Sequence, residues 1–288
     1  MSRPTAEQNN DRLFCWEQVN STNRLFRISR VFAHRGCAEK LLPLYALFSV
    51  VEQACSTLSD EHVAFSKLDW WRRECLHQDM TESQHPLLKE LSRTGAASEL
   101  RTDSITRLFD GATSRLSAAA PADMNGLASI CMEVHRPQLE LELDVAGLQD
   151  AERNFSQKLL ARNGMVQLLR ESSRMKEQGR FWWVPLNFLA RYSVSREDLS
   201  QTPDSPAAIQ LLADVLGDEA FGGSDMLDPS CSRPADYTPA RHVFAISGLY
   251  SRKLRQIKDV SADGLARDLG TPGPADLMAA WKCARKAG

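Results

Sequence analysis

The spacing of apolar residues most constrains the fold, because they recur every three or four positions along most of the chain. The clearest run comprises Leu41, Leu44, Tyr45, Phe48, Val51, Cys55 and Leu58, and similar runs occupy 159–169, 209–216 and 243–254. Such spacing places apolar side chains on one face of an α-helix. No alternation of apolar and polar residues persists long enough to predict a sheet. The sequence therefore predicts an all-α fold.

Turn-forming segments separate these helical runs without dividing the chain into domains. Gly, Pro, Ser and Asp gather at 92–98, 118–126, 200–206, 221–239 and 271–274. None of these segments is long or repetitive enough to be a linker between domains. With 43% hydrophobic residues in 288, the chain can bury a large core. We expect one domain.

Charge and motif content exclude several classes of function. The 35 basic and 37 acidic residues leave a net charge of −2, and no basic block indicates a nucleic-acid partner. The N-terminus lacks the apolar core of a signal peptide, and no run of 18 apolar residues predicts a membrane span. The seven cysteines form no CxxC pair, so we expect reduced thiols and no zinc site. These features predict a cytoplasmic protein.

A first polar stripe lies within the apolar helix at 41–58. At about 100° per residue, Tyr45, Ser49, Glu52 and Ser56 share one face. The stripe either lines a cavity or faces water, and the sequence alone leaves both alternatives open.

A second stripe occurs at 161–175. Gly164, Gln167, Glu171 and Met175 share one face of a predicted helix, flanked by Arg170 and Arg174. Asp144, which precedes this region at the end of another predicted helix, is expected to be a solvated acid.

Three motifs resemble the squalene/phytoene synthase family. They are LPLYAL at 42–47, KLDWWRRE at 67–74 and LARYSVSREDL at 189–199, and the C-terminal LYSRKLRQI and AAWKCARK follow in the family's order. The resemblance extends from about Arg24 to Lys286 and is weak between Leu91 and Lys158. It implies a single-domain, isoprenoid synthase-like helical bundle around a central cavity at 24–288, preceded by an N-terminal tail at 1–23.

The resemblance also implies what the two stripes would need in order to be catalytic. Catalytic members of the family condense two prenyl diphosphates, and aspartates at i and i+4 on two facing helices bind the Mg²⁺ that neutralises the leaving diphosphate. The family's first motif, DDxxD, corresponds here to Glu52, Gln53, Ala54, Cys55 and Ser56. Its second, DxxxD, corresponds to Glu171, Ser172, Ser173, Arg174 and Met175. Only Glu52 and Glu171 keep a carboxylate.

We therefore predict a non-catalytic member of the family, which needs no cofactor or metal and acts as an assembly or scaffold protein or as a binder of an isoprenoid lipid. It resembles the branch related to mitochondrial complex I assembly factors, which lacks intact Asp-rich motifs. The alternative is an active prenyltransferase on farnesyl or geranylgeranyl diphosphate, with Mg²⁺ held by Glu52 and Glu171. If the cavity is retained, its expected substrate-binding residues are Tyr45, Ser49, Gln167, Arg170 and Arg180. Lipid-handling relatives also allow peripheral contact with a membrane.

Overall fold

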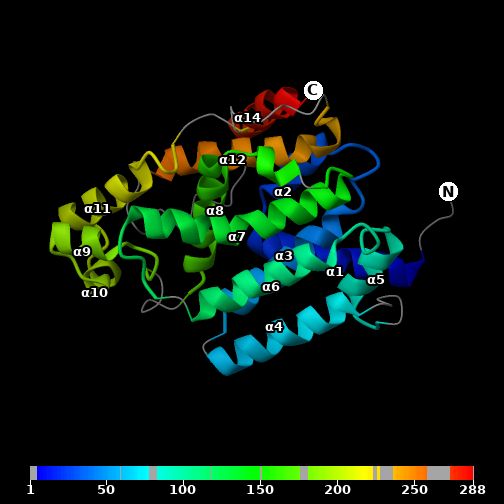
Figure 1. Cartoon of the computed structure of the whole chain (residues 1–288), viewed down its shortest axis with the longest axis horizontal. Coiled ribbons are helices and arrows are strands. Elements are labelled where there is room, and N and C mark those ends of the chain that lie inside the picture. The colour runs from blue at the N-terminus through cyan, green and yellow to red at the C-terminus, as the bar shows by residue number, and fades with distance from the viewer. Residues whose placement is uncertain are drawn as a thin grey trace.

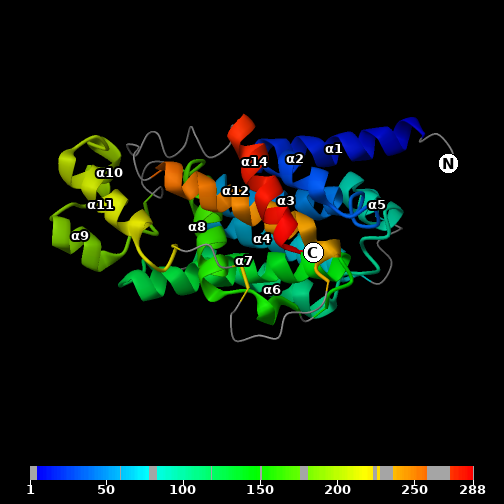
Figure 2. The ribbon, with the colours of Figure 1, turned by 90° about the horizontal axis from the view of Figure 1, so that it is seen from above.

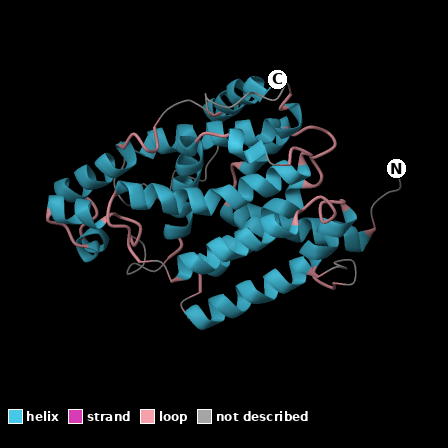
Figure 3. Cartoon of the chain, in the orientation of Figure 1, coloured by secondary structure: helices cyan, strands magenta, loops and turns pink. Residues whose placement is uncertain are grey.

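The computed structural model describes residues 5–58, 60–77, 83–117, 119–149, 151–175, 181–222, 226–227, 236–257 and 273–287. Within these ranges the regular elements are helices, and no β-strand is present (Figure 3). The predicted all-α fold is confirmed.

The α-helices vary from four to 22 residues. They are α1 (Ala6–Thr22), α2 (Phe26–Ser29), α3 (Leu41–Ser56), α4 (Glu61–Leu76), α5 (Pro86–Arg93), α6 (Thr102–Leu116), α7 (Met124–Val145), α8 (Gln157–Ser172), α9 (Leu186–Tyr192), α10 (Arg196–Gln201), α11 (Pro206–Gly217), α12 (Arg241–Ile257) and α14 (Pro274–Ala284).

Polar side chains fix where several of these helices begin. Asp60 accepts hydrogen bonds from the His62 and Val63 amides at the start of α4. Asp123 caps α7 and Ser156 caps α8 in the same manner. Each cap satisfies amides that have no partner within the helix. The helix predicted at 41–58 ends at Ser56, and α4 begins at Glu61.

Helix α3 lies at the centre of the bundle, in contact with α1, α5, α6, α7 and α8 (Figures 1 and 2). Every residue of α3 except Gln53 is buried. The helix is thus enclosed on all sides, and its polar stripe points into protein rather than into water.

Helices α7 and α8 approach each other closely at Gly164. A Cβ atom on Gly164 would lie 1.8 Å from the carbonyl oxygen of Cys131, which is far inside van der Waals contact. Glycine at this position of the second stripe is therefore required by the packing of two backbones.

The segment predicted as an N-terminal tail contains helix α1. Thr5 caps this helix and forms a capping box with Gln8. The helix packs on α3 and α5, with Cys15 and Val19 fully buried. Its last residue, Thr22, shares a hydrogen bond with Ser49 on α3. The segment is thus part of the bundle.

Helices α12 and α14 lie side by side along the top of the bundle in Figure 1. Helices α9, α10 and α11 gather at one end. Helix α14 leaves Leu277, Met278 and Trp281 about half exposed. Among the described residues, no helix is both long and apolar enough to cross a membrane.

Candidate functional site

The two polar stripes meet through ion pairs between α3 and α8. Glu52 is 4% exposed, and its Oε2 lies 3.3 Å from Arg170 Nη2. Its other oxygen, Oε1, lies 2.5 Å from Arg174 Nη2. One glutamate of the first stripe is therefore held by two guanidinium groups of the second helix.

The glutamate of the second stripe has a different cationic partner. Glu171 Oε1 lies 3.3 Å from Nη2 of Arg115, which comes from α6. Arg115 also donates from Nη2 to the sulfur of Cys55 at 3.5 Å. Arg115 lies in the region of weak resemblance, so no motif marked it as part of the site.

The balance between burial and nearby charges sets the direction of each glutamate's pKa. Burial raises the pKa of Glu52, but Arg170 and Arg174 outweigh burial, and the net pKa is lowered. Burial also raises the pKa of Glu171, and Arg115 only partly opposes it, while the negative charge of Glu52 adds to the rise. Glu52 is thus the fixed anion of the cluster.

Arg170 is further held by helix α12. Its Nη1 donates a hydrogen bond of 2.9 Å to the hydroxyl oxygen of Tyr250, which also accepts one of 2.8 Å from Asn23. Arg170 is buried, and its hydrogen bonds and ion pair offset the free-energy cost of removing its charge from water. Four helices, α3, α6, α8 and α12, therefore converge on this charge network.

Tyr45, the first residue of the α3 stripe, meets an acid from α7. Its hydroxyl hydrogen-bonds the carboxyl group of Glu142, whose pKa burial raises to about 8. His242 Nε2 lies 3.8 Å from Glu142 Oε2, and burial lowers the pKa of His242 to about 3. Both groups are therefore neutral near pH 7. Neither was singled out by the sequence, because each lies on an otherwise ordinary apolar helix.

The remaining residues of the α3 stripe also bond to protein. Ser49 lies 2.6 Å from the Thr22 hydroxyl, and Ser56 accepts a hydrogen bond from Arg174 Nε at 3.3 Å. Gln53 bonds instead to Gln18 and Ser21 of α1, outside the cluster.

The α8 stripe is only partly in the cluster. Gln167 donates to Gln138 of α7. Met175 lies beyond the end of α8 and is half-buried. Arg180 lies outside the described residues. The structure therefore brings Tyr45, Ser49, Gln167 and Arg170 into the interior, as the sequence suggested for a cavity lining, but with protein groups as their partners.

Asp144 corrects one sequence-based expectation. It is fully buried, and its carboxylate accepts from Arg101 Nε at 2.7 Å and from the Arg101 amide at 3.2 Å. The expected solvated acid is thus a buried anion that ties α7 to the start of α6.

The carboxylates of Glu52 and Glu171 do not fit a cluster of bound Mg²⁺ ions. Mg²⁺ requires several oxygen ligands in near-octahedral geometry, and each glutamate already faces at least one guanidinium group. Among the described residues, no group of three or more His, Cys, Asp or Glu side chains could hold a metal ion. Arg115, Arg170 and Arg174 therefore supply positive charge directly beside the two glutamates.

Comparison with known proteins identifies the family of this chain. A profile of the squalene/phytoene synthase family matches residues 20–272. The chain belongs to that family. No curated protein matches the sequence.

Two solved structures of family enzymes share its fold. The crystal structure of squalene synthase HpnC from Alicyclobacillus acidocaldarius is 15% identical, with a TM-score of 0.56, and the match covers 98% of this chain and 95% of that one. A dehydrosqualene synthase in complex with a ligand is 13% identical, with a TM-score of 0.66 and 97% coverage of both chains. At these identities the likeness extends to the fold alone. In this member of the squalene/phytoene synthase family, the glutamates on α3 and α8 are paired with arginines.

Proposed function

We propose that this family member is non-catalytic and acts by binding, as an assembly or scaffold protein or as a binder of an isoprenoid lipid. One observation supports the proposal: Glu52 and Glu171, which hold the surviving carboxylates of the two stripes, are each paired with arginine. The resemblance to the branch related to complex I assembly factors agrees with this function. We expect the protein to work in the cytoplasm, without a nucleic-acid partner.

The argument rests on the charge that the reaction would require. Ionising an allylic diphosphate leaves a highly charged anion that a cluster of bound metal ions would have to stabilise. Freeing Glu52 for a metal would strip Arg170 of its buried counter-ion, which is costly. The cluster therefore favours a permanent structural role for Glu52.

Arginine can also bind phosphate directly, which supports the competing function of an active prenyltransferase. In that case Glu52 and Glu171 would hold Mg²⁺, and Arg170 would contact the diphosphate. The two functions predict opposite results for turnover and for metal binding.

The test is incubation of the purified protein with farnesyl and geranylgeranyl diphosphates, with and without Mg²⁺. Diphosphate release and lipid products are both measured, and a catalytically active family enzyme serves as the positive control. We expect neither release nor product at high protein concentration. Metal-dependent release that disappears in Glu171→Gln would overturn the proposal. Calorimetry with Mg²⁺ alone gives an independent readout, in which we expect no binding.

A further inference from the structure

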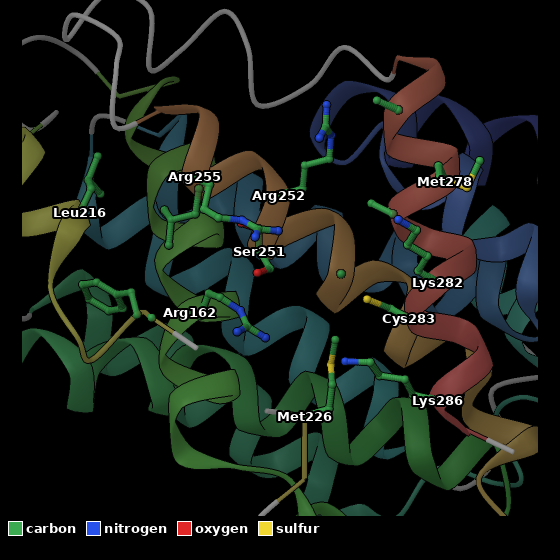
Figure 4. Close-up of a pocket in the computed structure, with 16 residues that line it drawn as sticks. Arg162, Leu216, Met226, Ser251, Arg252, Arg255, Met278, Lys282, Cys283 and Lys286 are labelled. Atoms are coloured by element: carbon green, nitrogen blue, oxygen red, sulfur yellow. The ribbon is translucent and has the colours of Figure 1, made fainter. Parts of the chain in front are cut away.

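A second site lies away from the α3–α8 cluster, between α12 and α14. The cavity there has a volume of about 780 Å³ and is lined by residues of α8, α11, α12 and α14 (Figure 4). Volumes of this size are typical of small-molecule sites. Arg162 lines it from the first half of α8, two turns before Arg170 of the central cluster.

The charge of this cavity has one sign. Its described lining residues include five cations, Arg162, Arg252, Arg255, Lys282 and Lys286, and no acid. Arg252 is engaged by Asp276, at 2.9 Å. The other four side chains extend toward the same space, Arg162 and Arg255 from one wall and Lys282 and Lys286 from the other (Figure 4).

Two of these cations are available for a ligand. Arg255 and Lys282 are exposed, and neither pairs with a carboxylate among the described residues. Arg255 donates from Nε only to the Ser251 carbonyl of its own helix, at 3.2 Å. Both side chains can therefore meet an incoming anion without breaking an ion pair.

Apart from Ser251, the rest of the lining is apolar. Leu216, Phe221 and Leu254 are almost fully buried and line the interior of the cavity. Met278 lines the cavity and is also 54% exposed, beside Leu277 and Trp281 on α14. An apolar surface thus continues from the cavity onto the outer face of the helix.

We propose that this cavity binds an amphiphile with a single anionic head group, a phosphate or a carboxylate. Arg255 and Lys282 contact the head group, and the apolar chain lies between the inner wall of Leu216, Phe221 and Leu254 and the exposed Met278. An acidic peptide would leave Met278 uncovered, whereas a lipid chain covers it. The inference does not rest on the α3–α8 cluster, because neither Glu52 nor Glu171 lines this cavity.

Dodecyl phosphate below its micelle concentration is the probe, measured by isothermal titration calorimetry. Dodecyl maltoside carries the same chain with a neutral head, and inorganic phosphate carries the head without the chain. We expect one dodecyl phosphate per protein, with both controls much weaker. Equal binding of either control would overturn the proposal, as would no binding of dodecyl phosphate.

Charge reversal locates the bound head group. Arg255→Glu and Lys282→Glu are each expected to weaken dodecyl phosphate binding by about tenfold or more, because each removes a charge-assisted contact. Arg285→Glu is the matched control: Arg285 is exposed near the end of α14, lies over the Trp281 ring and does not line the cavity. Equal effects of all three variants would indicate general surface attraction and overturn the proposal. Circular dichroism melts establish that each variant is folded.

Vesicles then distinguish a membrane lipid from a dispersed amphiphile. Retention on phosphatidylcholine vesicles that contain phosphatidate, lost in Lys282→Glu, would place the ligand in a bilayer. Dodecyl phosphate binding without vesicle retention would assign the cavity to a dispersed amphiphile. Both results support an anionic amphiphile site. Turnover of prenyl diphosphates has no bearing on either one, so this inference and the proposed function can fail separately.

Discussion

Replacing Glu52 with Gln should destabilise the protein strongly, because it removes the anion between Arg170 and Arg174 while keeping the shape of the side chain. At an effective dielectric constant of about 20, two unit charges 3.3 Å apart, as in the Glu52–Arg170 pair, attract by about 5 kcal/mol. Desolvation offsets much of that attraction in the intact pair. The variant, however, leaves Arg170 desolvated without its counter-ion, which typically costs about 3–5 kcal/mol.

The lower end of this range applies to Glu52→Gln. A glutamine oxygen can still accept one hydrogen bond, and the Arg174 side chain is 22% exposed and can turn toward water. We therefore expect a loss of about 3 kcal/mol in the free energy of unfolding, measured by urea denaturation followed by circular dichroism. Glu7→Gln is the matched control, because the Glu7 side chain that pairs with Lys89 is 72% exposed and the pair should contribute little.

The same titration separates a structural glutamate from a metal ligand. A bound metal stabilises the folded state by mass action, so Mg²⁺ would raise the stability of the wild type but not of Glu52→Gln if Glu52 were a ligand. We expect no effect of Mg²⁺ on either protein. A loss below about 1 kcal/mol in Glu52→Gln would refute the reasoning from buried charge.

Two further predictions concern packing and pH. Gly164→Ala should cost about 3 kcal/mol or more, since its Cβ would overlap a backbone carbonyl, whereas Gly126→Ala, with its nearest neighbour at 3.5 Å, should be tolerated in the same urea assay. Stability should be greatest near pH 6.5. Below that pH the unfolded chain protonates His135 and His242, whose folded pKa values burial lowers to about 3, so stability falls as the pH falls. Above pH 6.5, stability should fall by about 1.4 kcal/mol per pH unit up to pH 8. Burial raises the folded pKa of Glu142 to about 8, so the folded state keeps this proton after the unfolded chain has lost it. Denaturation between pH 5 and 8 measures both slopes. Glu142→Gln should abolish the fall between pH 6.5 and 8, and an unchanged fall in that variant would contradict the assignment.

The helical fold and the two glutamates of the site could be predicted from the sequence, because both depend on spacing along one helix. The 3.6-residue period predicted α3 and α8, and the motif positions marked Glu52 and Glu171. Periodicity alone could not decide whether the α3 stripe faced inward. That orientation follows from the helices that surround α3 on every side.

The partners of these glutamates could not be predicted, because they come from helices far away in the sequence. Arg115 and Tyr250 meet the cluster only when α6 and α12 pack against α3 and α8. Asp144 was predicted to be solvated because an acid at a helix end usually is, and it is buried only because Arg101 follows a loop that brings it to the same place. The environment of each charged side chain thus depends on tertiary contacts that local sequence does not reveal.

The position of Arg174 shows how the negative charge of Glu52 is neutralised within the protein. In the family pattern this helix carries a carboxylate at both ends of DxxxD, and facing acidic helices repel each other unless cations lie between them. Here Arg174 lies one residue before the second acidic position, and together with Arg170 it pairs with Glu52 across the gap between the helices. Side chains of the protein itself therefore supply the positive charge between α3 and α8. Arg170 and Arg174 occupy the carboxylate of Glu52 that a metal ion would need, so under the proposed function structural stability and the family's chemistry are alternatives at this site.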